Sequence, residues 1–205
     1  MILKSFMSNK LAIIGAGGHG KVVGEIAFLN EYKVIDFFDD RINNIKDFPF
    51  TIVDTVENLK IHFKKYDAFF VAIGDNELRS RKLKWLKENE LNIVNLIHPN
   101  STVSKFSTLG KGTCVMANAV INIGSLVKDG VIINTSASVD HDCFIDDYSH
   151  ISPNCSLSGE VKIGKLSHLG TGSSVYPGIN IGNNVKSGVG SKIFKNIFDG
   201  TIYKN

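Results

Sequence analysis

The stretch VSKFSTLGKGTCVMANAVINIGSLVKDG, residues 103–130, carries an aliphatic side chain at every sixth position. The period continues without a miss as far as Ile181. Its members are Val103, Leu109, Val115, Ile121, Val127, Ile133, Val139, Ile145, Ile151, Leu157, Ile163, Leu169, Val175 and Ile181. An amphipathic helix has a period near 3.6 and a half-buried strand a period of 2, so neither explains the pattern. A six-residue period is typical of a parallel β-helix, in which each hexapeptide is one short strand plus a corner.

The first half of the chain follows a different pattern, in which apolar runs alternate with helical periodicity. We expect strands at 11–15, 33–38, 67–73 and 92–97, and helices at 20–30, 55–65 and 76–89. Strands that alternate with helices indicate βαβ units on a parallel sheet. The sequence therefore predicts an α/β half-Rossmann-like domain over residues 1–98 and a β-helix over residues 99–205.

Composition limits the classes of function. The chain has 205 residues with a net charge of +3, and it contains no run of basic residues, which argues against a nucleic-acid partner. The three cysteines have no short metal-binding spacing and are expected to be buried thiols in a reducing compartment. No apolar run approaches the roughly 20 residues of a membrane span, and residues 1–10 lack the pattern of a signal peptide. We expect a cytoplasmic protein that does not insert into membranes.

A glycine-rich loop lies between the first predicted strand and the first helix. It reads Gly15-Ala-Gly17-Gly18-His19-Gly20 and has the context in which such a loop cradles a phosphate at a helix N-terminus. Asp39 and Asp40 end the next strand, where an acidic side chain can bind a ribose hydroxyl.

A second strip follows the third predicted strand. It begins at Gly74 and contains Arg79, which could pair with a phosphate. Carboxyl ends of parallel strands meet at one edge of a sheet, so we expect both strips to line one ligand pocket. A tight turn without a ligand, and an exposed helix arginine, are the alternatives.

Three histidines lie in the repeat region. His141 stands between Asp140 and Asp142, and a neighbouring carboxylate can orient an imidazole as a general base requires. His150 and His168 are one coil apart and should lie on the same face of the solenoid. We expect a role near the acyl donor for His150 and none for His168.

These motifs resemble the sugar O- and N-acetyltransferases of the left-handed β-helix (hexapeptide-repeat) superfamily. The similar group contains sialic acid O-acetyltransferases and N-acetyltransferases of nucleotide-linked 4-amino sugars. The resemblance rests on the glycine loop, on Phe38-Asp39-Asp40, on Ala72-Ile73-Gly74-Asp75-Asn76, on Asn95-Leu96-Ile97-His98-Pro99 and on residues 133–142.

The resemblance implies a left-handed β-helix that assembles as a homotrimer, with active sites between subunits and acetyl-CoA as co-substrate without a metal. The implied activity is N-acetylation of the 4-amino group of a nucleotide-linked amino-dideoxy sugar, UDP-linked as first choice, in surface glycan biosynthesis. O-acetylation of sialic acid is the alternative.

The resemblance also implies a set of site residues. His141 would be the general base, with Asp142 as its acidic partner. His150, Gly170 and Gly188 would contact acetyl-CoA, and Asn134 would face the sugar. The nucleotide-sugar pocket would be lined by Gly15, Gly17, His19, Asp39, Asp40, Gly74 and Arg79.

Two departures from the family pattern stand out. Asp142 follows the histidine where the related amino-sugar enzymes carry Glu, and the usual terminal Gly-x-Pro-Ala-Lys stretch is absent from the last residues. Three other readings stay open: a zinc enzyme similar to the γ-type carbonic anhydrases, a nicotinamide-dependent enzyme, and a non-catalytic scaffold that senses a nucleotide-sugar.

Overall fold

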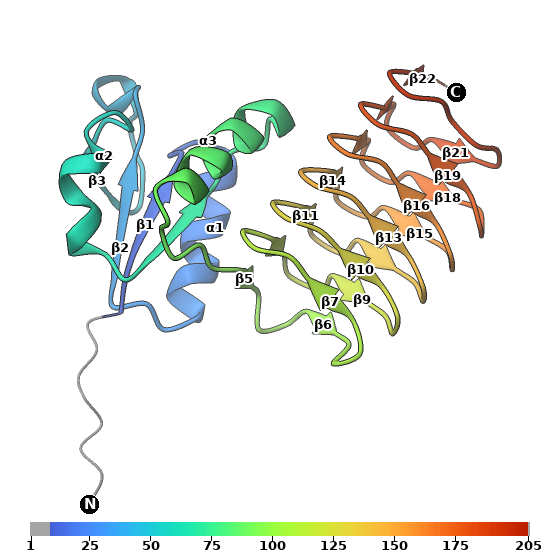
Figure 1. The fold of residues 1–205 in the computed structure, drawn as a ribbon, viewed down its shortest axis with the longest axis horizontal. Coiled ribbons are helices and arrows are strands. Elements are labelled where there is room, and N and C mark those ends of the chain that lie inside the picture. The colour runs from blue at the N-terminus through green and yellow to red at the C-terminus, as the bar shows by residue number, and fades with distance from the viewer. Residues whose placement is uncertain (1–8, 205) are drawn as a thin grey trace, which may run out of the picture.

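The computed structural model describes residues 9–204 as an α/β domain beside a three-sided solenoid of short strands (Figure 1). The expectation for a leader at residues 1–10 lies almost entirely outside the described residues. The α/β sheet is wholly parallel, with the strand order β3-β2-β1-β4. Its strands are β1 (Lys10–Ile14), β2 (Val34–Phe38), β3 (Thr51–Asp54) and β4 (Ala68–Val71).

Helices cover both faces of this sheet. They are α1 (Gly18–Leu29), α2 (Leu59–His62) and α3 (Asn76–Glu88), with 3₁₀ turns η1 (Ile42–Asn44) and η2 (Phe63–Lys65). Successive residues of a strand point to opposite faces, so Leu11 and Ile13 pack with α1, whereas Ala12 and Ile14 pack with α2 and α3. The domain is thus the doubly wound, half-size fold that the sequence predicts, although strand β3 was not foreseen.

The solenoid consists of three parallel sheets of seven, six and five strands. The first sheet contains β5 (Leu96–Ile97), β8 (Cys114–Val115), β11 (Ile132–Ile133), β14 (His150–Ile151), β17 (His168–Leu169), β20 (Lys186–Ser187) and β22 (Ile202–Tyr203). The second contains β6 (Thr102–Val103), β9 (Val120–Ile121), β12 (Ser138–Val139), β15 (Ser156–Leu157), β18 (Ser174–Val175) and β21 (Lys192–Ile193). The third contains β7 (Thr108–Leu109), β10 (Leu126–Val127), β13 (Phe144–Ile145), β16 (Lys162–Ile163) and β19 (Asn180–Ile181).

The register confirms the hexapeptide prediction. Residues one coil apart pair directly, as His150 does with His168 and Val127 with Ile145. The aliphatic residue of each repeat points inward and forms one continuous core along the axis. Where the period fails, Ser187 still ends strand β20, and its hydroxyl accepts a hydrogen bond from the Gly170 N–H at 3.0 Å. A polar side chain is tolerated at this position because its hydroxyl is hydrogen-bonded.

The solenoid turns each corner with one residue of positive φ, which recurs every six positions from Gly112 to Gly190. Most L-residues lose roughly 1–2 kcal/mol in this conformation, and Gly or Asn avoids much of the cost. Tyr148 and Leu166 adopt it nonetheless, at φ 60 in both cases, and both pack against the α/β domain. Docking of the two domains therefore offsets local strain in the solenoid.

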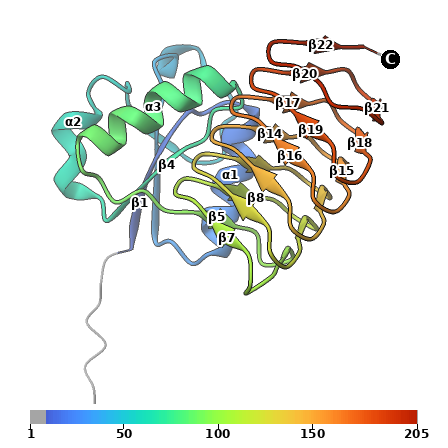
Figure 2. The same ribbon diagram turned by 45° about the vertical axis from the view of Figure 1, so that its right-hand side comes forward.

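The two domains share their cores. Cys114 and Ile132 of the first solenoid sheet pack in the cluster that contains α1, and α1 lies between the α/β sheet and the solenoid (Figure 2). The predicted strand at 92–97 is divided between the domains, because Ile93 bridges to Phe69 of the α/β sheet and β5 pairs with β8 of the solenoid. The solenoid therefore begins at Leu96 rather than at Pro99, which corrects the predicted boundary.

Candidate active site

The glycine loop is a tight connection between β1 and α1. Gly15 has φ +105, and a Cβ there would lie 2.8 Å from the carbonyl oxygen of Ala72, just after β4. A Cβ on Gly20 would meet the carbonyl oxygen of Gly15. By contrast, a Cβ on Gly18 would meet nothing within 4 Å. The loop therefore packs against the sheet with Gly15 and Gly20 and leaves its outer side open.

A cavity of about 680 Å³ opens on that outer side. Six of the predicted pocket residues line it: Gly15, Gly17, His19, Asp39, Asp40 and Gly74. The first turn of α1 leaves its N–H groups without intrahelical acceptors, and the N-cap residue Gly17 supplies no side-chain cap. Free N–H groups at a helix N-terminus beside a cavity suit an anion such as a diphosphate.

Asp39 holds the loop together. Its Oδ2 accepts the Ala16 N–H at 2.8 Å and an Arg41 guanidinium N–H at 2.9 Å, and its Oδ1 accepts from the Arg41 backbone N–H and Nε. Burial alone would raise the pKa of Asp39, but the hydrogen bonds from Arg41 and Ala16 outweigh burial and hold it below its usual range. The predicted direct contact of Asp39 with a ribose is not supported, because both carboxylate oxygens are occupied within the protein.

Two cations in this cavity were missed at the sequence level, Arg41 and Lys82. Arg41 directly follows the Asp39-Asp40 pair, and Lys82 lies one helical turn after Leu78 on α3. The positions of both residues beside predicted site residues were present in the sequence. Neither has a motif of its own, since a basic residue near a strand end or on a helix is usually solvent-exposed.

Arg79 does not line the cavity, and its predicted role as a phosphate ligand is wrong. The side chain is 1% exposed, and all its N–H groups are used within the protein. It donates to the carbonyl oxygens of Ile73 and Gly74 in the α/β domain and to those of Gly130 and Tyr148 in the solenoid, at 2.7–3.0 Å.

A further hydrogen bond from Arg79 reaches Asn76 Oδ1 at 2.7 Å, and the amide nitrogen of Asn76 donates to the Leu166 carbonyl. Arg79 and Asn76 thus join the end of the cavity to three solenoid corners, at Gly130, Tyr148 and Leu166.

A cluster of imidazoles lies where the domains meet. The rings of His150 and His168 stack with centroids 4.4 Å apart. Burial, together with the charge of Arg79, lowers the pKa of His19 to about 4. Burial, followed by the charges of His168, Arg79 and His19, lowers the pKa of His150 to about 2. His19 and His150 are therefore neutral at physiological pH.

Two nitrogens in this cluster have no partner among the described residues: Nε2 of His19 and Nδ1 of His150. The Asn134 side-chain amide lies 2.9 Å from His150 Nε2, and Ser152 Oγ lies 2.9 Å from His168 Nε2. Asn134 therefore orients His150 here. Buried polar atoms without partners are rare in native structures, so the two free nitrogens mark a place where a ligand or water can bind.

The glycines predicted to meet the CoA arm have their amides engaged. The N–H of Gly170 donates to Ser187 Oγ, and the N–H of Gly188 donates to the Tyr203 carbonyl at 2.9 Å. A Cβ on Gly170 would meet the Gly188 carbonyl oxygen, so close stacking of successive coils explains the absence of a side chain at Gly170. Neither amide is free to bind a ligand.

His141 and Asp142 form a hydrogen-bonded pair at a corner that follows β12. Nδ1 of His141 lies 2.9 Å from Oδ2 of Asp142, and the imidazole side chain is 49% exposed. The hydrogen bond that His141 donates to Asp142, with the charges of Asp140, Asp142 and Glu160, raises the pKa of His141. The pair leaves Nε2 as the nitrogen that can take a proton, which is the arrangement of a general base.

Two glycines make room for this pair. A Cβ on Gly159, one coil after His141, would lie 2.5 Å from the imidazole Nε2 and Cε1. A Cβ on Gly124, one coil before Asp142, would meet the Asp142 carboxylate. The imidazole and the carboxylate therefore each pack over bare backbone of a neighbouring coil.

One chain does not bring all the predicted residues together. His150 lies in the first solenoid sheet, and Asn134 directly follows a strand of that sheet, which faces the α/β domain. His141 follows a strand of the second sheet, at the corner of the solenoid opposite the first sheet. Within the described residues, no group of three or more His, Cys, Asp or Glu side chains is arranged to hold a metal ion. None of the described helices is long and apolar enough to cross a membrane.

The glycine-loop domain and the hexapeptide solenoid with a histidine–carboxylate pair define a left-handed β-helix acyltransferase class. Residues 10–86 match the PglD N-terminal domain family. A UDP-N-acetylbacillosamine N-acetyltransferase from Bacillus subtilis is 35% identical over 113 residues. That alignment covers 53% of this chain and 52% of the relative, so the chain matches about half the length of this curated relative.

Solved structures match along nearly the whole chain. The acetyltransferase domain of PglB from Neisseria gonorrhoeae, in complex with acetyl coenzyme A, is 41% identical, with a TM-score of 0.92 and 97% of each chain covered. A variant of perosamine N-acetyltransferase from Caulobacter crescentus, in complex with CoA and GDP-perosamine, is 33% identical. Its TM-score is 0.90, with 96% of this chain and 93% of the relative covered. This chain belongs to the hexapeptide-repeat sugar N-acetyltransferase family.

Proposed function

We propose that this chain transfers the acetyl group of acetyl-CoA to the 4-amino group of a nucleotide-linked amino-dideoxy sugar in surface glycan biosynthesis. The observation that carries the proposal is the pairing of an anion-binding glycine-loop cavity with an exposed His141–Asp142 pair. Relatives named for UDP- and GDP-linked amino sugars support both nucleotides, and a UDP-linked sugar is our first choice.

In this mechanism the sugar amine attacks the thioester carbonyl and loses a proton to Nε2 of His141. The C–N bond forms, the C–S bond breaks, and the CoA sulfur leaves with the proton that His141 returns. Asp142 stabilises the imidazolium that exists between these steps. His150 would lie beside the acyl donor, because its hydrogen bond with Asn134 and its stacking on His168 hold the ring in place.

The active site is formed by two subunits in this proposal. His141 and the glycine-loop cavity lie at different sides of the solenoid, so the His141 pair of one subunit would face the cavity and His150 of the next. A closed trimer supplies such a contact three times by symmetry. The exposed apolar side chains Phe106, Ile123 and Tyr176 near the same corner suit a surface buried between subunits.

The test is release of free thiol from acetyl-CoA with a panel of nucleotide-linked 4-amino sugars and with free sialic acid. Turnover with an amino sugar and none with sialic acid is the expected result. Turnover with sialic acid alone would instead establish O-acetylation by the same residues. Absence of thiol release with every acceptor would overturn acetyl transfer as the function.

A further inference from the structure

A buried serine lies beneath the turn that carries the His141–Asp142 pair. Ser125 is 1% exposed and precedes Cys143 by one coil of 18 residues. Its hydroxyl donates a hydrogen bond to the carbonyl oxygen of Asp140 at 2.7 Å and accepts one from the Cys143 N–H at 3.1 Å. These two hydrogen bonds, the Ser125 bridge, join both ends of the turn at residues 140–143, with the pair between them.

Packing of the solenoid does not require a hydroxyl at this place. In the later coils of the same corner, the residues in register with Cys143 are Val161 and Ile179, and both belong to the apolar core. A buried hydroxyl costs free energy unless it is hydrogen-bonded, so Ser125 is compatible with the core only through its bridge. The bridge therefore points to a demand of the turn itself.

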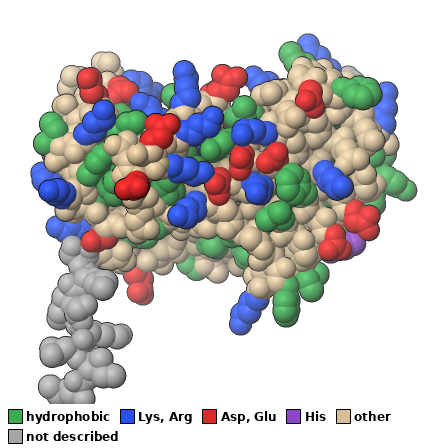
Figure 3. All heavy atoms as spheres, in the orientation of Figure 1, with side chains coloured by type: hydrophobic (Ala, Val, Ile, Leu, Met, Phe, Trp, Pro, Cys, Tyr) green, Lys and Arg blue, Asp and Glu red, His purple; other side chains and the backbone are tan. Residues whose placement is uncertain are grey.

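The alignment of the pair depends on the backbone of this turn. Within one chain both side chains are exposed, and Figure 3 shows a histidine side chain beside a group of Asp and Glu side chains at the solenoid surface. The preceding coil supplies the restraints: the Ile123 carbonyl accepts the Asp142 N–H at 3.1 Å. The Asn122 amide donates to Oδ1 of Asp140, which also accepts the His141 N–H. An Asp side chain has only two torsions, so a displaced turn moves its carboxylate relative to the imidazole.

We infer that Ser125 is a positioning residue for the reaction, because its bridge fixes the turn in which Nδ1 of His141 meets the carboxylate of Asp142. The inference rests on the proposed function, since it assumes that His141 is the general base. It adds a residue that touches neither substrate and acts on catalysis through the geometry of the base.

The chain contains a matched control for this bridge. Ser167 is fully buried, and its hydroxyl donates to the Gly182 carbonyl oxygen at 2.7 Å and accepts the Val185 N–H at 3.0 Å. The turn at residues 182–185 has its positive-φ residue, Asn184, at the same place and contains no ionisable side chain. Ser125→Ala and Ser167→Ala therefore remove the same two hydrogen bonds from equivalent turns, and only one turn carries the catalytic pair.

The first measurement is steady-state acetyl transfer together with thermal unfolding. Both alanine variants should lose similar thermal stability, because each loses the same hydrogen bonds. Ser125→Ala should lower kcat by about tenfold or more with little change in KM, since a misplaced base weakens the transition state. Ser167→Ala should keep the wild-type kcat. Equal kcat values for the two alanine variants would overturn the inference.

Ser125→Thr tests whether the hydroxyl is the group that matters. Thr113 occupies the equivalent position of another repeat, is fully buried and donates to the Lys128 carbonyl oxygen at 3.1 Å. Threonine is thus accommodated at this position of the repeat, and Ser125→Thr should keep a kcat near that of the wild type. A kcat as low as that of Ser125→Ala, at wild-type thermal stability, would contradict the role of the bridge.

A titration of the His141 imidazole tests the geometry without any substrate. Its hydrogen bond to Asp142, with the charges of Asp140, Asp142 and Glu160, raises the pKa of His141. In protein with carbon-13-labelled histidine, NMR should show that Ser125→Ala lowers this pKa toward its ordinary value, whereas the control variant leaves it in place; His141→Ala assigns the signal. An unchanged pKa in Ser125→Ala would overturn the inference. If the wild type acetylates no amino sugar, the proposed function fails, and this titration still decides whether the bridge aligns the pair.

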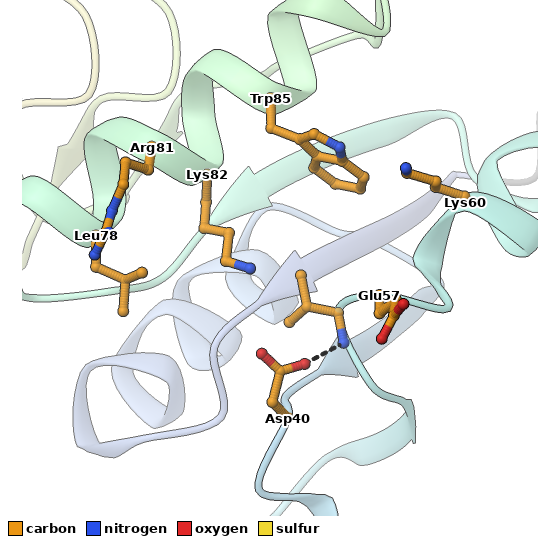
Figure 4. A pocket seen from close by; sticks show the side chains of 8 residues that line it. Asp40, Glu57, Lys60, Leu78, Arg81, Lys82 and Trp85 are labelled. Atoms are coloured by element: carbon orange, nitrogen blue, oxygen red, sulfur yellow. Dashed lines mark hydrogen bonds between the residues drawn. The ribbon is translucent and has the colours of Figure 1, made fainter.

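Binding of UDP checks the other half of the proposed site. Asp40 and Lys82 line the glycine-loop cavity in the α/β domain (Figure 4), and neither serine hydroxyl hydrogen-bonds to that domain. Calorimetry should therefore give equal affinities for UDP in the wild type and both alanine variants. Weaker binding by Ser125→Ala alone would mean that the serine acts through the cavity rather than through His141, and would overturn the inference.

Discussion

The hydrogen bond between His141 and Asp142 is the smallest unit on which the chemistry depends. Asp142 occupies a corner at φ 57, a conformation in which Asn is as well tolerated as Asp. The Asp142→Asn substitution therefore removes the negative charge with little change in backbone strain. The variant therefore measures what the negative charge of Asp142 contributes to catalysis.

Asp142→Asn should move the acidic limb of the pH–activity profile to lower pH. The carboxylate raises the pKa of His141, and a base works only when deprotonated, so activity is lost as pH falls through that raised value. Without the charge the pKa falls, and kcat falls because the imidazolium is less stable. The measurement is kcat against pH; a limb that stays in place would show that His141 is not the titrating base.

Gly159→Ala should disturb His141 without disturbing the fold. The new methyl group would occupy the space of the imidazole, which must rotate outward and lose its alignment. We expect kcat to fall by about 10- to 100-fold, within the range that general-base catalysis contributes, with unchanged thermal stability. Ser158→Ala, one residue earlier, is the control. Equal activities of the two variants would mean that ring packing on Gly159 has no catalytic importance.

At the scale of elements, α3 joins the two domains through Arg79. Among residues 9–204 the guanidinium makes no hydrogen bond to a carboxylate. It is held by carbonyl oxygens just after β4 and at two solenoid corners. Such an arrangement satisfies the charge only while all the elements stay together. The glycine-loop cavity therefore depends on the solenoid for the position of Gly74.

Arg79→Met should destabilise the protein by about 3–5 kcal/mol, because several buried carbonyl groups lose their donor together. For a chain of this size, thermal unfolding should shift by about 2–4 °C per kcal/mol. KM for the nucleotide-sugar should also rise. Arg81→Met, an exposed arginine on the same helix, should change the unfolding temperature by little. Similar unfolding temperatures for both variants would contradict the proposed interdomain role.

At the scale of the whole molecule, the proposed mechanism needs a second subunit, because His141 and the glycine-loop cavity lie on different sides of the solenoid. This requirement can be tested with two inactive variants. His141→Ala lacks the base and keeps the cavity, whereas Gly18→Trp fills the cavity and keeps the base. Each alone should lose activity.

Coexpressed in equal amounts, the two variants should recover about one quarter of wild-type activity. With random mixing, that is the fraction of subunit contacts that pair an intact cavity with an intact His141. The measurement is acetyl transfer by the purified mixed oligomer, with its mass determined in solution. No recovery from a mixed oligomer would mean that each chain carries a complete site.

The sequence by itself determined the solenoid, because an inward aliphatic residue every sixth position admits one local solution that repeats along the axis. It also determined the glycine loop and the His141–Asp142 pair, since these groups are adjacent or nearly adjacent in the chain. Apart from strand β3, the helices and strands of the α/β domain could be predicted for the same reason, because each is set by local periodicity.

Only the tertiary structure decided the roles of side chains whose partners are distant in the sequence. Arg79 was predicted to bind phosphate and instead joins the domains, because its carbonyl partners lie up to 70 residues away. The carboxylate oxygens of Asp39 proved to be occupied by Arg41 and Ala16, whereas Lys82 proved to line the glycine-loop cavity. The sequence gives the chemical groups of each side chain, but whether its polar atoms are free to bind a ligand depends on which distant segments pack against it.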